Sequence, residues 1–273
     1  MLTPRVLAPG RDARYLTYAC VGQHRVSGWL SSRATVLVDL VDDLQRDEAV
    51  AGGACEIGVH HGRLFLLLRL LMRAGETAVA IDVFEDQHLN VDGSGLGDRA
   101  AFERHLVRWV GTMDGTRIQQ ADSTLIDGAQ VRGWAGGGVR LFSIDGGHTA
   151  PITARDLQTA SECLVDGGAV ILDDVFNEAF PAVSEGLLGY LADPGHRLVP
   201  SVVVGNKTLL VDRAWSERYQ ERAEQVLTRT GLYAQRHDYG GANVLTLASR
   251  PLVEQIEFWT TFARQWAERQ RSR

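Results

Sequence analysis

Segments with the composition of buried strands alternate with helical patterns through the middle of the chain. From Val26 to about Glu48, apolar residues recur at helical spacing, which predicts an amphipathic helix packed on a larger body. Five strands are then expected, at 52–58, 78–84, 116–122, 139–145 and 167–174, and three helices lie between them, at 63–73, 99–109 and 153–164. Alternation of this kind indicates a parallel sheet with right-handed crossovers.

The two ends of the chain break this pattern. Residues 1–25 are expected to form an irregular arm, and 197–213 hold two apolar runs around Gly205-Asn206, which predicts an antiparallel hairpin that closes the sheet. Helices at about 214–229 and 251–270 are expected, with a short strand near 243–247 between them. No linker is evident. We therefore expect residues 1–273 to form a single domain, with an N-terminal arm and helix (1–50), a central core (51–213) and a C-terminal helical addition (214–273).

Composition places the chain among ordinary globular proteins. Of its 273 residues, 45% are apolar and 23% are charged, which excludes a wholly disordered, collagen-like or coiled-coil chain. A net charge of −6 disfavours nucleic acid as the main partner. Cys20, Cys55 and Cys163 are too scattered for a disulfide framework or a zinc site, and they suit a reducing, cytoplasmic compartment. The most apolar run, Leu64 to Met72, is too short to span a membrane, and no signal peptide is recognisable.

Every one of the five predicted parallel strands ends in a carboxylate. In an open parallel sheet, ligands bind outside the carboxyl ends of the strands, so these acids are expected to share one rim. An acidic rim repels phosphates and suits ribose hydroxyls, a cationic ligand or a metal ion. The acids, in chain order, are Glu56, Asp82, Asp122, Asp145 and the pair Asp173-Asp174.

The turn after the first strand, EIGVHHG, narrows the choice of ligand. Glu56 stands where a G-x-G-x-x-G dinucleotide turn has its first glycine, and no G-K-[ST] follows, so the P-loop pattern is absent as well. Gly58 and Gly62 still allow a ligand to approach the backbone closely. Asp82 follows Gly58 at about the spacing of an acid that binds a ribose diol. S-adenosylmethionine, which has a ribose, a carboxylate, a positive centre and no phosphate, fits this rim.

The ordered motifs EIGVHHG, AIDVF, ADS, IDGGH and GGAVILDD resemble those of class I S-adenosylmethionine-dependent methyltransferases, in particular the metal-dependent small-molecule (sugar) O-methyltransferase branch. The resemblance covers about residues 50–213. It implies a Rossmann-like α/β fold with a seven-stranded, mostly parallel sheet that ends in an antiparallel hairpin. It also implies that Glu56, Gly58 and Gly62 line the methionine end of the cofactor, that Asp82 holds the ribose, and that Asp122 and Ser123 face the adenine.

Methyl transfer to a hydroxyl needs a group that removes the proton, and a divalent cation that lowers the hydroxyl pKa assists it. Asp145, Asp173 and Asp174 offer carboxylate oxygens suited to Mg²⁺ (or Mn²⁺). His148 lies three residues after Asp145, where the resembling enzymes have a catalytic base. We expect His148 to take the proton, with Asp145 as the alternative acceptor. The acceptor is expected to be a sugar or a sugar-containing small molecule, in bacterial natural-product or polysaccharide biosynthesis.

Other polar and aromatic residues near the rim allow weaker predictions. At most one of the adjacent His60 and His61 should lie near the cofactor, and the stretch 85–98, with His88 and Asn90, is interpreted as a lid, a substrate wall or a solvent loop. Phe176, Asn177 and Phe180 are candidates for the acceptor wall.

Two other functions stay open at this point, and so does the oligomeric state. The chain could be a nucleotide-dependent oxidoreductase, which the missing glycine pattern disfavours, or a non-catalytic cofactor-binding module, which the group of acids around His148 disfavours. No nucleic-acid or membrane partner is expected. The C-terminal helix, with Trp259 and Trp266, offers either a homo-oligomer surface or a cap on the core. Lys207 is the single lysine among otherwise arginine basic residues, a bias that a GC-rich genome also produces.

Overall fold

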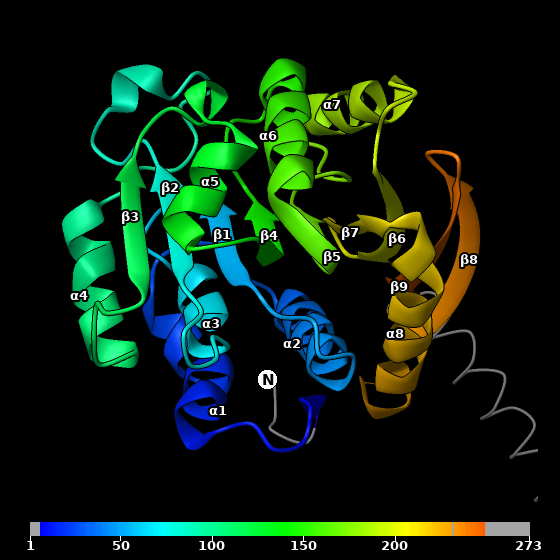
Figure 1. The fold of residues 1–273 in the computed structure, drawn as a ribbon, viewed down its shortest axis with the longest axis horizontal. Helices are drawn as coiled ribbons and strands as arrows, with labels where there is room; N and C mark the ends of the chain where they lie inside the picture. Colours follow the sequence, from blue (N-terminus) through cyan, green and yellow to red (C-terminus); the bar gives the residue numbers. More distant parts are fainter. Residues whose placement is uncertain (1–5, 231, 249–273) are drawn as a thin grey trace, which may run out of the picture.

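The computed structural model describes residues 6–230 and 232–248, which form a mixed sheet between two layers of helices (Figure 1). Within these ranges the sheet has nine strands in the order β3-β2-β1-β4-β5-β7-β6-β9-β8. Strands β1 to β5 pair in parallel, β7 is antiparallel to β5 and β6, and β8 is antiparallel to β9. The strands are β1 (Gly53–Ile57), β2 (Ala78–Asp82), β3 (Thr116–Gln120), β4 (Val139–Ile144), β5 (Leu164–Leu172), β6 (Leu198–Val204), β7 (Lys207–Asp212), β8 (Tyr233–Tyr239) and β9 (Ala242–Ala248).

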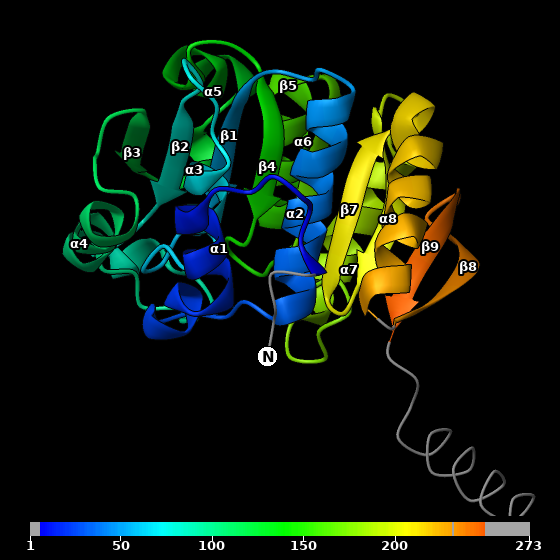
Figure 2. The same ribbon diagram turned by 90° about the horizontal axis from the view of Figure 1, so that it is seen from below.

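Helices cover both faces of the sheet and create two cores. The α-helices are α1 (Ala13–Cys20), α2 (Ser32–Asp47), α3 (Phe65–Leu70), α4 (Arg99–Trp109), α5 (Gly128–Ala135), α6 (Ala150–Cys163), α7 (Pro181–Ala192) and α8 (Ser216–Thr230). Helices α1–α4 and α8 pack on one face, and α5–α7 pack on the other (Figure 2). The central strands are buried on both sides, since Ala54 of β1 belongs to the first core and its neighbour Cys55 to the second.

The predicted α/β class, with a mostly parallel sheet and an antiparallel hairpin, is confirmed, and β6 and β7 meet at the expected Gly205-Asn206 turn. The sheet is wider than the seven strands implied by the resemblance, because residues 233–248 add the hairpin β8–β9. The predicted strand at 243–247 lies in β9 and the predicted helix at 214–229 in α8. The expected helix at 251–270, with Trp259 and Trp266, lies outside the described residues. The single-domain division stays a prediction.

The prediction of an irregular N-terminal arm is wrong, because that arm contains α1. The Asp12 side chain caps α1 by accepting a hydrogen bond from the backbone N–H of Tyr15, and Tyr15 and Tyr18 are buried. Helices α5 and α7 were also missed. An Asp127–Gln130 capping box marks the start of α5 in the sequence, so a search for caps would have found that helix.

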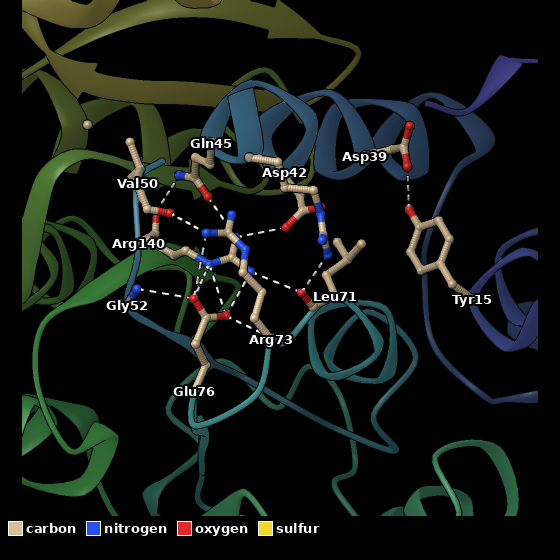
Figure 3. A network of polar contacts seen from close by, with 12 residues as sticks. Tyr15, Asp39, Asp42, Gln45, Val50, Gly52, Leu71, Arg73, Glu76 and Arg140 are labelled. Atoms are coloured by element: carbon tan, nitrogen blue, oxygen red, sulfur yellow. Dashed lines mark hydrogen bonds and ion pairs between the residues drawn. The ribbon is translucent and has the colours of Figure 1, made fainter. Parts of the chain in front are cut away.

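A buried polar network fixes α2 against the sheet, at the edge opposite the carboxyl ends of the strands (Figure 3). Arg140, at the start of β4, is fully buried, and its guanidinium lies 2.9 Å from Asp42 Oδ1 and 3.1 Å from Glu76 Oε2. It also donates hydrogen bonds to Gln45 Oε1 (2.8 Å) and to the carbonyl of Leu71 (3.0 Å). The arginine can be buried here because Glu76, Gln45 and the Leu71 carbonyl accept its hydrogen bonds, and the charge of Asp42 compensates its own.

No helix among residues 6–230 and 232–248 is both long enough and apolar enough to cross a lipid bilayer.

Candidate active site

A cavity of about 490 Å³ lies at the carboxyl ends of the five parallel strands. Each of these strands contributes lining residues from its end or from the turn that follows, as expected for an open parallel sheet. In chain order these residues are Gly58, Asp82, Asp122 with Ser123, Asp145 with His148, and Asp173 with Asp174. The topology therefore brings most of the predicted site residues to one place.

The turn after β1 is shaped by a close approach of two strands. Gly58 has a φ of +82°, and a Cβ built there would lie 1.7 Å from the carbonyl oxygen of Asp145. Only glycine fits at this position, because both the φ value and the contact exclude a side chain. Gly62 also has a positive φ, but it packs against the Phe102 ring and does not line the cavity.

Glu56 lies behind the cavity wall rather than in it. Its side chain is buried, and its Oε2 atom has no hydrogen-bond partner among the described residues. Burial, followed by the negative charge of Asp145, raises the pKa of the Glu56 carboxyl well above its ordinary value. Glu56 therefore belongs to the acidic group beneath the cavity floor.

The two acids predicted to bind the nucleoside are held in place by the backbone. Asp82 accepts hydrogen bonds from the N–H groups of His60 (2.7 Å) and Phe84 (2.6 Å), which fix both of its oxygens at the cavity wall. Asp122 caps the short 3₁₀ helix Ser123–Leu125 through Oδ1, which accepts from the N–H and the hydroxyl of Thr124. The capping role explains why an acid occurs there, and Asp122 still lines the cavity.

His148 lies at the centre of the other half of the cavity. Its Nδ1 atom is 2.8 Å from Asp92 Oδ2 and 3.1 Å from the Ser94 hydroxyl, while the backbone N–H of His148 donates to the same Asp92 oxygen at 2.8 Å. The opposite ring atom, Nε2, lies 3.2 Å from Asp174 Oδ2 and 4.0 Å from Asp145 Oδ1. The imidazole stacks on the Phe180 ring with centroids 3.8 Å apart. These contacts fix the plane of the ring and direct Nε2 towards the two acids.

The charges around His148 perturb one another strongly. Burial alone would lower the pKa of His148, but its hydrogen bonds to Asp174 and Asp92 outweigh burial and raise it to about 9. Burial likewise opposes ionisation of Asp174, yet hydrogen bonds from His148, Asn177 and Asn206 lower its pKa to about 2. These shifts indicate an ion pair between an imidazolium and the Asp174 carboxylate.

The three aspartates predicted to bind a metal do not all face the same point: Asp145 and Asp174 lie together, and Asp173 is paired elsewhere. Asp145, His148 and Asp174 each place one potential ligand atom within 4.8 Å of the others. Burial, followed by the charge of Asp173, raises the pKa of Asp145 to about 8. Asp173 instead forms a short ion pair with the Nζ atom of Lys207, and both side chains are buried. Asp173 is thus engaged with an ammonium group.

The sequence pattern did not reveal the partner residues that hold the site together. Asp92 and Ser94 lie in the polar stretch 85–98, which forms a cavity wall through Leu89, Asn90, Ser94 and other residues. Asn206 and Lys207, at the tip of the β6–β7 hairpin, contact Asp174 and Asp173 respectively. A lone lysine directly after a predicted hairpin turn was the available signal for the last of these.

Some of the residues for which the sequence allowed weaker predictions line the cavity, and others point away from it. His60, Asn177 and Phe180 line the cavity. His61 turns away to the carbonyl of Leu96, and the half-exposed Phe176 contacts the Tyr239 ring.

Comparisons with known proteins relate the sequence and the fold to methyltransferases. Residues 55–175 match the family model of a methyltransferase domain, and no curated protein matches the chain. Among solved structures, the O-methyltransferase NovP is similar with a TM-score of 0.52 at 17% identity, over 66% of this chain and 80% of NovP. Cofactor-bound Rv0187 from MTB gives 0.51 at 17% identity, over 76% and 93%. The TDP-rhamnose 3'-O-methyltransferase CalS11 gives 0.48 at 17% identity, over 67% and 81%. At identities this low, the similarities to NovP and Rv0187, whose TM-scores exceed 0.5, show a common fold and nothing more.

Proposed function

We propose that this chain, a class I methyltransferase whose residues 55–175 match the methyltransferase domain, acts on a sugar. In this proposal it transfers a methyl group from S-adenosylmethionine to a hydroxyl of a sugar or sugar-containing small molecule. One observation carries the proposal: a single cavity contains both the ribose-type acid Asp82 and the group formed by His148, Asp145 and Asp174. The first suits the cofactor, and the second suits activation of an acceptor hydroxyl.

The cofactor half of the cavity fits an adenosyl group without phosphates. Asp82 has both oxygens oriented by backbone N–H groups, so the lone pairs that remain are positioned to accept from two ribose hydroxyls. Asp122 and Ser123 line the part of the cavity where we place the adenine, and Gly58 leaves the wall near the methionine end without a side chain. Glu56 and Gly62 do not line the cavity, so direct contact of either with the cofactor requires the turn after β1 to rearrange.

Bound S-adenosylmethionine supplies an electrophilic methyl group next to a positive sulfur. The chain must then hold the acceptor oxygen in line with that methyl group and remove the hydroxyl proton as the O–C bond forms and the C–S bond breaks. We assign proton removal to Nε2 of His148 in its neutral form. This is the minor form near neutral pH, because Asp174 and Asp92 favour the imidazolium, so turnover should rise with pH. Asp92 holds Nδ1 of the same ring, which is the arrangement in which a carboxylate orients a catalytic imidazole.

The residues in the cavity fit a divalent cation, but with two carboxylate ligands where the sequence predicted three. A Mg²⁺ or Mn²⁺ ion at this position would lower the pKa of the acceptor hydroxyl. Asp145 and Asp174 are the carboxylates that we propose to hold it, since Mg²⁺ commonly binds through one or two carboxylates and completes its shell with water and substrate. Asp145, whose side chain is crowded by other acids, gains a positive neighbour in this arrangement.

The walls beside His148 support a polyhydroxylated acceptor in biosynthesis of natural products or polysaccharides. Four polar residues line the cavity, and their amide and hydroxyl groups retain hydrogen-bonding capacity beyond the bonds that they make to neighbouring residues: Asn90, Ser94, Asn177 and Asn206. Trp29, whose side chain is 75% exposed, lies at its edge and offers an aromatic surface of the kind that packs against a sugar ring.

The direct test measures formation of S-adenosylhomocysteine when the protein is incubated with S-adenosylmethionine, Mg²⁺ and a panel of nucleotide sugars and glycosides. Turnover with at least one sugar, lost in excess chelator and restored by Mg²⁺, is the expected result. Calorimetric titration with S-adenosylmethionine and with NAD separates the proposal from an oxidoreductase. Binding of NAD in preference to S-adenosylmethionine would overturn the proposed function, and full turnover in chelator would remove the metal from it.

A further inference from the structure

The tip of the β6–β7 hairpin reaches under the cavity and places the chain's single lysine among buried acids. Lys207 is fully buried, and its ammonium forms the short ion pair with Asp173 Oδ2. The charges of Asp145 and Glu56 also act on this ammonium. A buried lysine is costly unless it is paired, so the acids at this position compensate its charge.

The hairpin tip fixes both members of the Asp173-Asp174 pair in different ways. Asn206 donates a hydrogen bond to Asp174 Oδ1 at 2.7 Å, and Val175 donates its N–H to the carbonyl of Asn206 at 3.1 Å. Asp174 has a φ of +60°, so the backbone turns sharply between the two acids and sends their side chains to different partners. Both acids line the cavity, but Asp174 pairs with His148 inside it, whereas Asp173 pairs with Lys207, which does not line it.

We infer that Lys207 is a positioning residue that keeps Asp173 out of the cation site, so that a divalent metal binds through Asp145 and Asp174. This inference rests on the proposed function only for the place of the cation. Lys207 supplies a permanent positive charge at the carboxylate that the pattern of strand-end acids assigned to the metal. Removing that charge should free Asp173 to become a metal ligand.

The test measures binding of Mn²⁺ alone, by calorimetry and by the loss of the free-ion electron paramagnetic resonance signal. Asp173→Asn and Asp174→Asn form a matched pair, because they make the same change at adjacent residues. Loss of an outer partner of a metal ligand typically costs roughly 10- to 100-fold in affinity. Since Asp174 is proposed as a ligand itself, we expect Asp174→Asn to weaken Mn²⁺ binding by at least that factor and Asp173→Asn to change it by much less. An equal loss in the two variants would overturn the inference.

A second arm removes the lysine. Lys207→Met should bind Mn²⁺ roughly tenfold or more tightly than the unsubstituted protein, and Lys207→Met/Asp173→Asn should lose most of that gain. An equally large gain in the double variant would show a general charge effect and would refute the role of Lys207 in diverting Asp173. No gain in Lys207→Met would refute it as well. Binding of S-adenosylhomocysteine by each variant verifies that its cavity has formed.

This experiment tests the proposed metal site and the role of Lys207 independently. If the unsubstituted protein binds no Mn²⁺, the metal in the proposed function is wrong. The inference about Lys207 then still stands or falls on whether Lys207→Met acquires binding that depends on Asp173.

Discussion

Asp156 tests whether a buried carboxyl group is protonated or ionised in the folded protein. It lies on α6, is fully buried, and neither of its carboxylate oxygens has a hydrogen-bond partner among the described residues. Burial raises its pKa from 3.8 to about 7 and outweighs the nearby Ser123 hydroxyl, which favours the ionised form. Between these two values the unfolded chain is ionised at this residue and the folded chain is not. Stability is therefore lost as the pH rises through this window, and the loss is complete above about pH 7.

The magnitude follows from the separation of the two pKa values. A difference of about 3 at 1.36 kcal/mol each corresponds to about 4 kcal/mol of lost stability at pH 8, of which less than half is already lost at pH 5. Asp156→Asn cannot ionise. Its free energy of unfolding relative to the unsubstituted protein should therefore rise by about 2 to 3 kcal/mol between pH 5 and pH 8. Any constant cost of burying the amide cancels in this comparison.

Urea unfolding followed by circular dichroism at pH 5, 6.5 and 8, without cofactor, measures this difference. Asp238→Asn, at an exposed position on β8, is the control for the substitution itself. A difference between Asp156→Asn and the unsubstituted protein that stays constant across the three pH values would refute the reasoning. It would mean that Asp156 is ionised inside the fold and has a compensating partner.

Four further predictions concern the site and the network behind it. Asp82→Ala should weaken S-adenosylmethionine binding by about 1.5 to 3 kcal/mol in a calorimetric titration, because two hydroxyls lose a charged acceptor, and unchanged affinity would exclude the ribose role. His148→Ala should lower turnover of an accepted sugar by about two to four orders of magnitude with little change in cofactor affinity; if Asp145→Asn abolishes turnover and His148→Ala is mild, the base is Asp145. Gly58→Ala should abolish S-adenosylhomocysteine binding, since its methyl group would overlap the carbonyl of Asp145, and normal binding would contradict that contact. Arg140→Met should cost about 1 to 3 kcal/mol in chemical denaturation, because Glu76, Gln45 and the Leu71 carbonyl lose a buried donor although Asp42 keeps Arg11 and Arg46, whereas no measurable loss would show that these acceptors re-pair.

The sequence predicts the core of this fold well because its signals are local. Buried parallel strands appear as short apolar runs, and an acid at the end of each run marks the rim that the topology assembles. Asp82, Asp122, Asp145 and Asp174 therefore meet in one cavity as expected. Short helices such as α1, which has eight residues, depend on the tertiary contacts of their buried side chains and are too short to show a clear helical period.

Contacts between residues that lie far apart in the chain could not be predicted from the sequence. The pairing of Asp173 with Lys207 joins residues 34 positions apart and depends on the register of β5 against β7. The sequence gives no reason to prefer this pairing over a metal ligand role, because an aspartate suits both. The link between Asp92 and His148 likewise depends on how the stretch 85–98 folds over the cavity.

The buried network around Arg140 limits how this protein can be divided. Two of its members, Asp42 and Gln45, precede the segment that matches the methyltransferase family, and the hairpin tip that binds Asp173 and Asp174 follows it. A fragment cut to residues 55–175 would retain the arginine and both acids but would lose these partners. Recombination at the family boundaries would thus expose two charge imbalances at once. For the same reason, chimaeras with related enzymes should exchange α2 and the β6–β7 hairpin together with the strands that they contact.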